Sequence, residues 1–289
     1  MAVEANLTTD LAGAMSIDFA ERFGQRFTSL TDLLGVQRVL PLQAGSVIKT
    51  YTSSVTLDGT AVEPGDVIPL SAVVLEDGPA QELTWDKKRK AVAMEDVQRY
   101  GFEKAINLTD NKLLNEVQKG IRTKFLGQLA TGTGVATGAD LQGVLAQNWA
   151  AVSAKFDEED VQVISFINPF DAADYLGSAN VTTQTAFGMT YVQDFLNNRV
   201  VFMSAEITKG TVYSTADQNL VAAYALMNGG EINKAFDFVT DPSGIVGITH
   251  DINKQRLTAE TITAYGVVLF AERLDGVVVG KIEAVPAGA

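Results

Sequence analysis

The chain contains no cysteine and only one histidine among its 289 residues. Without cysteine it has no disulfide framework, no thiolate nucleophile and no cysteine-ligated zinc or iron–sulfur site, which fits assembly in a reducing compartment. One histidine cannot supply a two-histidine metal motif. A Ser–His–Asp triad would need His250 beside an activated serine, and the sequence has no Gly-x-Ser-x-Gly motif. Because Ile248 and Ile252 alternate with His250, we interpret it as a structural or surface strand residue.

Long apolar runs and an excess of positive charge are also missing. No apolar stretch approaches the roughly 18 residues of a transmembrane helix, and the first residues lack the basic and apolar regions of a secretory signal. The formal net charge of −13 argues against a protein that grips phosphate backbones, since that affinity comes from Lys and Arg. We therefore expect no membrane partner, no cofactor and no sequence-specific binding of nucleic acid.

Two segments with the composition of ligand sites do not have the spacing that such sites need. The acidic run at residues 157–160 lacks the glycine and the spaced oxygen ligands of a calcium loop, so a solvated turn or helix start is the better interpretation. The glycine cluster at residues 131–138 has neither the dinucleotide-binding spacing nor a Gly-Lys-Ser/Thr step, and we interpret it as a linker. We predict no catalytic, cofactor or metal residues, although a pair among the 35 acidic residues could still meet in space.

Residues 46–94 form an extended, turn-broken segment. Its first part, residues 47–57, is rich in β-branched residues and precedes Asp58-Gly59, a strong hairpin turn signal. The predicted return limb, residues 81–90, combines Trp85 with a dense run of charge. A hairpin of this length has little helix of its own to pack on. We expect it to contact another copy of the chain.

Two amphipathic helices flank this segment. Between residues 11 and 34, Phe19, Phe23 and Phe27 recur on one helical face, and Gly35 follows as a C-cap. This face could lie on its own domain or on a neighbouring subunit. A second helix, at residues 95–130, carries Val117, Ile121 and Phe125 on one side, and 35 residues would span ~50 Å. Gly101 and Gly120 weaken the case for an unbroken helix.

The rest of the chain alternates short strands and helices. A buried strand at residues 161–167 leads into a helix with Asn168 as N-cap and Pro169 at its first position. Further strands are predicted at residues 199–203, 211–214 and 220–226. At the end of the chain, we predict that residues 256–273 and 277–283 pair around the turn Asp275-Gly276.

The charged run at residues 85–90 allows two interpretations. Lysines on an exposed strand discourage edge pairing, and this is their common use. An aromatic residue beside Lys and Arg is also typical of interface anchors, which an acidic partner surface would complement. We favour the second interpretation, so the predicted inter-subunit contacts of the extended loop are Tyr51, Trp85, Lys87, Lys88 and Arg89.

The order and length of these parts resemble the tailed-phage major capsid proteins of the Hong Kong 97 type. The resemblance covers residues 11–283, and it includes the strand-to-helix step at residues 167–177 and the connection at residues 250–254. It implies an α+β fold with an N-terminal arm, an extended β-hairpin loop, a long spine helix, an axial α/β domain and peripheral-domain strands. It also implies a subunit that assembles as hexamers and pentamers into an icosahedral or prolate virion shell, and that is not an enzyme.

The resemblance assigns the chain to five parts. Residues 1–45 would be the N-terminal arm with its amphipathic helix, 46–94 the extended loop, and 95–139 the spine helix and peripheral domain. Residues 140–233 would form the axial domain, and 234–289 the peripheral-domain strands and C-terminus. Some family members cross-link their loops through lysine and asparagine, but no motif here matches that chemistry.

The implied partners are other copies of the chain, a portal protein, a decoration protein in some shells, and packaged double-stranded DNA. Since only about 45 residues precede the loop, a separate scaffolding protein is expected. Assembly would take place in the host cytoplasm. The main alternative is an encapsulin-like bacterial compartment shell. A more remote one is a soluble α/β enzyme with an unidentified carboxylate site, which would be a monomer or small oligomer with a well-formed pocket.

Overall fold

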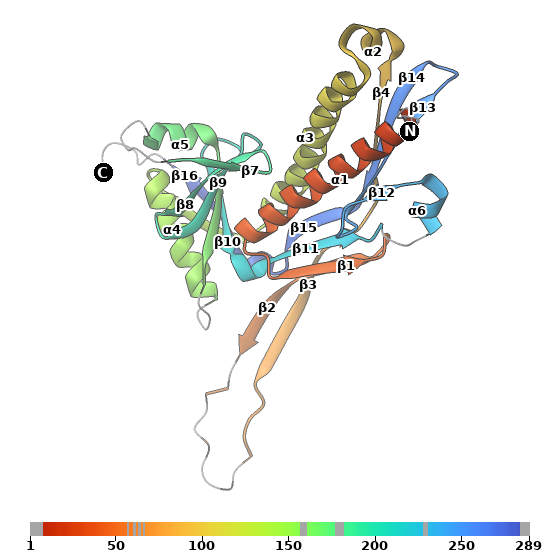
Figure 1. The fold of residues 1–289 in the computed structure, drawn as a ribbon. Coiled ribbons are helices and arrows are strands. Elements are labelled where there is room, and N and C mark those ends of the chain that lie inside the picture. Colours follow the sequence, from red (N-terminus) through yellow and green to blue (C-terminus); the bar gives the residue numbers. More distant parts are fainter. Residues whose placement is uncertain are drawn as a thin grey trace.

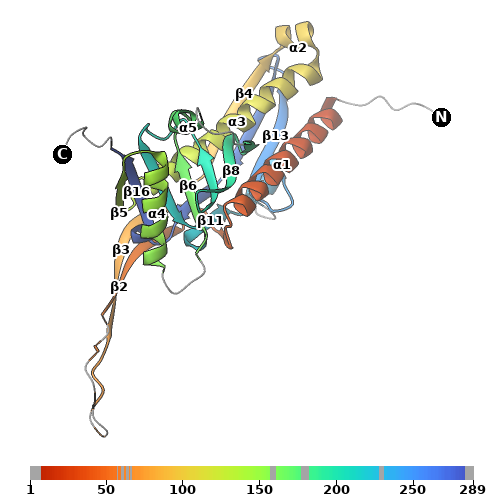
Figure 2. The ribbon, with the colours of Figure 1, turned by 90° about the vertical axis from the view of Figure 1, so that its left-hand side faces the viewer.

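The computed structural model describes residues 8–56, 58–59, 62, 65, 67–156, 161–176, 182–227 and 231–283, and the account below concerns these residues. The predicted α+β class is confirmed. A body of helices and strands carries one long β-hairpin that projects far beyond it (Figures 1 and 2). The acidic run at residues 157–160 and residues 57, 64 and 66 of the predicted loop lie outside the described residues.

The helices and strands are named here in chain order. They are α1 (Thr8–Leu33), β1 (Arg38–Leu42), β2 (Val47–Thr56), β3 (Ala72–Glu82), β4 (Asp86–Ala93), α2 (Met94–Tyr100), α3 (Phe102–Leu129), β5 (Gly134–Gly138), α4 (Leu141–Lys155), β6 (Val163–Ile167), α5 (Pro169–Leu176), β7 (Gln184–Ala186), β8 (Met189–Phe195), β9 (Asn198–Met203), β10 (Thr211–Ala216), β11 (Leu220–Ala225), α6 (Glu231–Phe236), β12 (Val239–Thr240), β13 (Val246–Asn253), β14 (Thr258–Tyr265), β15 (Val267–Ala271) and β16 (Val277–Ile282). Short 3-10 turns at Asp217–Asn219 and Leu274–Gly276 precede β11 and β16.

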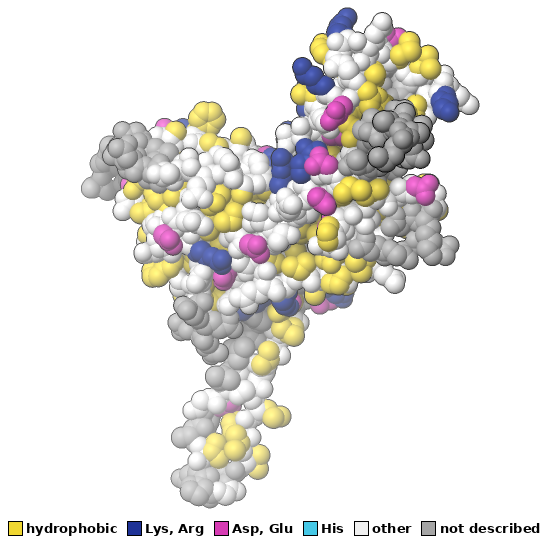
Figure 3. Space-filling model, in the orientation of Figure 1, with side chains coloured by type: hydrophobic (Ala, Val, Ile, Leu, Met, Phe, Trp, Pro, Cys, Tyr) yellow, Lys and Arg dark blue, Asp and Glu magenta, His cyan; other side chains and the backbone are white. Residues whose placement is uncertain are grey.

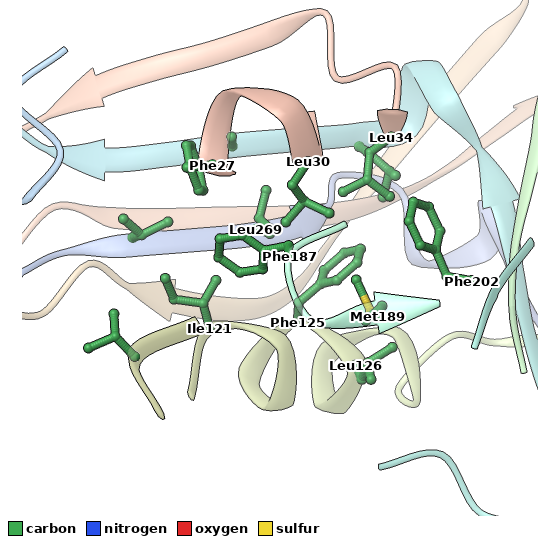
Figure 4. Packing of buried hydrophobic residues seen from close by; sticks show 14 of the residues in the cluster. Phe27, Leu30, Leu34, Ile121, Phe125, Leu126, Phe187, Met189, Phe202 and Leu269 are labelled. Carbon is green, nitrogen blue, oxygen red and sulfur yellow. The ribbon is translucent and has the colours of Figure 1, made fainter. Parts of the chain in front are cut away.

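The apolar face of α1 packs within its own chain. Phe19, Phe23 and Phe27 are buried in the main core, and α1 lies against β12, β13 and α3. Gly35 follows the helix with φ of 62°, the left-handed conformation that ends helices at little cost for glycine. Figure 4 shows side chains of α1 and α3 meeting those of the strands in this core. Of the two interpretations offered for this face, packing on its own domain is the one observed.

The predicted long helix is broken near its start. Gly101 has φ of 83°, which separates α2 from α3, so the spine helix begins at Phe102 and not near residue 95. Gly120 lies inside α3, where its missing side chain faces the Tyr265 hydroxyl. The core face of α3 is formed by buried residues that include Val117, Ile121 and Phe125, as the helical spacing predicted. The ring of Phe125 meets that of Phe166 edge-on at 5.4 Å, which joins α3 to β6.

Strands that follow α3 in the chain build a 7-stranded sheet in the order β5-β16-β10-β6-β9-β8-β7. Helix α4 packs on it through contacts with β5, β10 and β16. The predicted step from β6 into α5 is confirmed, because the Asn168 side chain accepts a hydrogen bond from Phe170 N at 2.8 Å. Next to this unit lie a 4-stranded sheet (β12-β13-β14-β4) and a 3-stranded sheet (β1-β11-β15) (Figure 1). The 4-stranded sheet contacts α1 through β12 and β13 and contacts α3 through β4, and the 3-stranded sheet contacts α3 through β15.

Two predictions about strands are wrong. Residues 277–282 do not pair with the preceding strand, because β16 lies between β10 and β5 while β15 pairs with β11. The glycine cluster is also not a linker, because residues 134–138 form β5, parallel to β16. Its glycines permit a close approach: a Cβ at Gly138 would lie 2.5 Å from Val144 N, and one at Gly134 would lie 2.9 Å from Val277 O.

Candidate inter-subunit surfaces and a buried polar network

The projecting hairpin consists of β2 and β3, paired from Val47 with Glu82 to Thr56 with Ala72. One irregularity between Lys49 and Tyr51 interrupts the ladder, and there Gly78 lies against Thr50 so closely that a Cβ would be 2.6 Å from its hydroxyl oxygen. Across the strands Lys49 Nζ is 2.6 Å from Asp77 Oδ2, and this hydrogen bond raises the pKa of Lys49. The pair is exposed, so it adds little to stability.

The hairpin is fixed to the body at its root. Tyr51 N donates to Glu272 O at 3.1 Å, and Leu83 N donates to Ser46 O at 2.9 Å. The Leu83 side chain is fully buried, which fixes the end of the hairpin where β3 leads toward β4. Of the predicted contact residues, Tyr51 therefore lies at the root of the hairpin, half-buried, and not on its free end.

The far part of the hairpin exposes apolar side chains to solvent. Val67 is 91% exposed and Leu70 95%, and Ile68, Val73, Val74 and Leu75 are also exposed. Figure 3 shows hydrophobic side chains gathered on this projection, away from the body of the molecule. Single exposed apolar residues are common on protein surfaces, whereas a contiguous group marks a site of interaction. Sequence reasoning expected residues 46–94 as a whole to contact another copy, but the individual contact residues that it named do not include any of these apolar side chains.

The predicted return limb is corrected by the structure. The hairpin ends at Glu82, and residues 86–93 form β4, which pairs antiparallel with β14 in the 4-stranded sheet. The charge-rich sequence of β4 fits an edge strand equally well, so the sequence pattern did not distinguish the two. Lys87, Lys88 and Arg89 are exposed on this edge strand, and Trp85 is half-buried just before it.

Some of the charges on β4 already have partners within the chain. Arg89 Nη2 lies 2.6 Å from both carboxylate oxygens of Glu260, and this hydrogen bond lowers the pKa of Glu260. Asp86 accepts from Lys124 Nζ at 2.5 Å, which ties the start of β4 to α3. No ion pair involving Lys87 or Lys88 is present among the described residues.

A buried polar network lies between α1, α3, β4 and β13. Lys90 Nζ is 2.7 Å from Asp110 Oδ1, and His250 Nε2 is 2.9 Å from Asp110 Oδ2. On the other side of the ring, His250 Nδ1 is 2.6 Å from Ser16 Oγ. Thr261 Oγ1 completes the set by donating to Asp110 at 3.3 Å. The network joins the N-terminal part of the chain to the spine helix and to the 4-stranded sheet.

Burial and pairing act in opposite directions on the charged members of this network. Burial opposes ionisation of Asp110, but its hydrogen bonds with His250 and Lys90 outweigh burial and hold the pKa of Asp110 below its ordinary value. Burial also lowers the pKa of Lys90, and the attraction of Asp110 only partly offsets this. Since an ionised carboxylate only accepts hydrogen bonds, the His250 ring donates its Nε2 proton to Asp110.

Ser16, His250 and Asp110 have the composition of a catalytic triad but not its geometry. In a triad the serine faces Nε2 and the carboxylate binds Nδ1, whereas here the two positions are exchanged. All three side chains are buried, so a substrate has no access to the serine oxygen. The network is structural, and His250 is a strand residue of β13 as predicted.

One signal for this network is present in the sequence. Asp110 lies on the apolar face of the spine helix, four residues after Ile106 and four before Leu114, both of which are buried. An acidic residue on such a face needs buried partners. The sequence could not identify Ser16 and His250 as those partners, because they are distant in the chain.

A pocket of about 1040 Å³ lies beside α1, lined by residues that include Glu21, Asp32, Asp194, Arg199 and Asp241. The carboxylate of Asp241 already accepts from the backbone N–H groups of Ser243, Ile245 and Val246 at 2.7 to 3.1 Å. Arg199 Nη1 donates a hydrogen bond to Asp217 Oδ2 at 3.0 Å. Among the described residues, no cluster of His, Cys, Asp or Glu is placed to hold a metal ion. Asp241 and Arg199 therefore have structural tasks at this pocket.

A second pocket, of about 930 Å³, lies at the root of the hairpin. All residues that line it are uncharged, and they include Pro41 and Leu42 of β1, Trp85, Leu226 and Ile232.

None of the described helices is long and apolar enough to span a membrane.

Comparison with known proteins gives similarity in fold but none in sequence. No protein-family model and no curated protein matches the chain. The capsid of an empty GTA particle matches with a TM-score of 0.55 and 8% identity, covering 98% of this chain and 93% of the other. The mature capsid of bacteriophage PhiM1 has a TM-score of 0.54 and 9% identity, with 88% and 87% covered.

A bacterial compartment shell gives a similar result. The SrpI encapsulin of Synechococcus elongatus matches with a TM-score of 0.50 and 11% identity, covering 90% of each chain. These similarities extend over most of each chain, so the solved structures share the overall fold of this one. The chain has the Hong Kong 97-type capsid fold.

Proposed function

We propose that this protein is the major capsid protein of a tailed double-stranded DNA phage. Copies of the chain would assemble as hexamers and pentamers into a closed head shell and would enclose the genome without binding particular sequences. The observation that carries the proposal is the hairpin β2–β3, which exposes contiguous apolar side chains far from its own core. A monomer gains nothing from such a projection, whereas a neighbouring subunit would bury it.

The fold similarity supports the same conclusion. The GTA, PhiM1 and encapsulin structures belong to shells or capsids, and each is covered over most of its length. The net charge of −13 also suits a container, because acidic inner surfaces would let packaged DNA slide without adhering. We propose a virion location, with assembly in the host cytoplasm, and a purely structural role without enzymatic activity.

The division into parts is proposed with it. Residues 1–45 would act as the N-terminal arm, 46–94 as the loop region, 95–139 with 234–289 as the peripheral domain, and 140–233 as the axial domain. Two strands of the 7-stranded sheet, β5 and β16, lie outside residues 140–233, while β11 lies inside this range but pairs with β1 and β15. The 7-stranded sheet of the proposed axial domain therefore includes strands from before residue 140 and after residue 233.

The proposed inter-subunit contacts are Tyr51, Trp85, Lys87, Lys88 and Arg89. Residues 46–82 contain one lysine and six acidic residues, so the hairpin of a neighbour would meet the cations of β4 with opposite charge. Phe19, Phe23 and Phe27 of the arm helix and Val117, Ile121 and Phe125 of the spine helix would keep the body rigid while the contacts form. Further proposed partners are a separate scaffolding protein, a portal and a decoration protein.

The second candidate is an encapsulin-like compartment shell, which the similarity to the S. elongatus encapsulin favours. It would use the same subunit geometry around an enzyme cargo. The soluble α/β enzyme is a weaker alternative, because Asp241 and Arg199, two of the charged residues at the pocket of about 1040 Å³, are engaged in structural bonds.

The test is electron microscopy with sedimentation velocity on the protein expressed alone. We expect closed particles or capsomer-sized hexamers and pentamers. Particles purified from the native source then separate the two shell functions: enzyme cargo indicates a compartment, and packaged DNA indicates a capsid. A monomer at all concentrations, both alone and after refolding with a candidate scaffolding protein, would contradict the proposal.

A further inference from the structure

Basic residues are unevenly distributed along this acidic chain. Residues 87–124 contain ten Lys or Arg and five Asp or Glu, which is a formal charge of +5. Since the whole chain has −13, the remaining residues sum to −18. The positive segment covers most of β4, all of α2 and most of α3. An asymmetry of this kind within one chain is typical of a surface that meets a polyanion.

The exposed face of the spine helix carries a row of lysines. Lys104, Lys112 and Lys119 are separated by eight and seven residues, close to two helical turns each, so they lie on one face of α3. All three are exposed, and none of them has an ion pair in the described part of the chain. Glu116 lies between two of them in the sequence but pairs with neither. At 1.5 Å per residue, the row is about 22 Å long.

Helix α1 adds arginines to the same face. Arg22 Nη1 donates to Asn111 Oδ1 at 2.7 Å. One turn further along both helices, Arg26 Nη1 donates to Asn115 Oδ1 at 3.4 Å. Asparagine is neutral, so it positions a guanidinium without cancelling its charge. Arg22 also pairs with Asp18, whereas Arg26 has no carboxylate partner among the described residues. Figure 3 shows basic side chains where α1 and α3 run side by side in Figure 1.

We propose that Arg26, Lys104, Lys112 and Lys119, here called the basic stripe, contact the phosphate backbone of duplex DNA. This rests on the proposed enclosure of the genome and names the surface that meets it. One DNA strand carries a phosphate every 3.4 Å along the axis, so about six phosphates lie along 22 Å. Contacts to phosphates do not read sequence. The acidic remainder of the chain keeps each contact weak, and many copies in one shell add their contacts together.

The surroundings of the basic stripe favour DNA over an acidic protein segment. Protein interfaces are anchored by clustered apolar or aromatic side chains. Between Lys104 and Lys119, Leu108 is the one strongly exposed large apolar residue of α3, at 59%. A single exposed apolar side chain is ordinary on a protein surface. A partner that offers regularly spaced negative charge and no apolar surface therefore fits the stripe best.

The test measures the binding of a labelled DNA duplex to the unassembled full-length protein by fluorescence anisotropy at 50 and 200 mM salt. Four phosphate contacts predict roughly 100-fold weaker binding at the higher salt, because each contributes about 0.9 to the slope of log K against log salt. The variant Arg26→Gln/Lys112→Gln/Lys119→Gln should lower that slope by about 2.7. The matched control, Lys209→Gln/Lys254→Gln/Arg256→Gln, removes the same charge at exposed positions outside α1 and α3 and should keep the slope.

Equal effects of the two triple variants would overturn the inference, as would an absence of salt-dependent DNA binding by the wild type. Tighter binding of poly-L-glutamate than of DNA would also overturn it, because the stripe would then fit an acidic protein. Electron microscopy of the same preparations separates the two proposals. Shells without stripe-dependent DNA binding would reject the stripe and leave the shell function standing, whereas stripe-dependent binding by a chain that never assembles would reject the shell function alone.

Discussion

The carboxylate of Asp110 lies 2.9 Å from Nε2 of His250 and joins the spine helix to β13. The same carboxylate holds Lys90 of β4 at 2.7 Å. One buried acidic residue thus connects α3 with β4, which precedes it closely in the chain, and with β13, which lies far along it. In the proposed shell the subunit would carry load between its arm, spine and sheet, so Asp110 is a position where the body of the subunit can be weakened without altering its surface.

Asp110→Asn should destabilise the folded chain by roughly 3 kcal/mol, because it leaves the largely buried Lys90 without its counter-charge. The measurement is urea unfolding of wild type and variant. The control is Asp251→Asn on the exposed side of β13, which should change the free energy of unfolding by less than about 0.5 kcal/mol. Equal effects of the two substitutions would show that the network adds no stability.

Stability should also fall with acidification through Asp110. Its pKa is lower in the folded chain than the ordinary value of about 3.9, so the unfolded state takes up this proton first as pH decreases. The stabilisation is present above that ordinary value and is lost as pH falls through the folded pKa. The difference in unfolding free energy between wild type and Asp110→Asn should therefore shrink below about pH 4. A difference that stays constant down to the acid limit would contradict this.

Gly138→Ala should destabilise the chain, because a Cβ there would lie 2.5 Å from Val144 N and force β5 away from α4. Backbone atoms cannot move aside as a flexible side chain can. We therefore expect the free energy of unfolding to fall by about 1–3 kcal/mol, the range for overpacking. Gly127→Ala is the matched control: its Cβ meets nothing within 4 Å inside α3, so it should stabilise by up to about 1 kcal/mol. Thermal unfolding of the two variants gives the direction of each change in stability. A stabilising effect of Gly138→Ala would contradict the close packing of β5.

Shortening the hairpin should separate assembly from folding. Replacing residues 57–71 by an Asn-Gly turn keeps the pairing of Thr56 with Ala72 and removes part of the exposed apolar segment. We expect an unchanged melting temperature and loss of particles by microscopy, because none of the described residues between 57 and 71 is buried in the core. Normal particles from this variant would show that assembly does not need the deleted part of the hairpin.

Charge reversal on β4 tests the other half of the proposed contact. Lys87→Glu with Lys88→Glu should reduce particle yield at low salt, because the acidic hairpin of a neighbour would meet like charge. Both residues are exposed, so the free energy of unfolding of the monomer should change by less than about 0.5 kcal/mol. Trp85 is left unchanged because its half-buried ring packs near Gly266. Equal losses in assembly and monomer stability would mean that this strand belongs to the core.

Several elements could be predicted because their signals are local. The spacing of Phe19, Phe23 and Phe27 gave the buried face of α1, and Asn168-Pro169 gave the start of α5. The pairing of β16 could not be predicted in this way. The turn residues Asp275-Gly276 suggested a hairpin, but β16 finds its neighbours in β10 and β5, which are distant in the chain. The interpretation of the glycine cluster as a linker failed for the same reason, because its glycines allow the backbone to pack closely against Val277 and Val144.

The sequence by itself determined the types and order of the elements, because helical periodicity, capping residues and β-branched runs act over a few residues. That order was enough to indicate a Hong Kong 97-type capsid fold. Tertiary structure decided where the hairpin ends, which strands share a sheet, and that Ser16, Asp110, Lys90 and His250 form one buried network. These features depend on contacts between residues distant in the chain, which close only when the whole core packs.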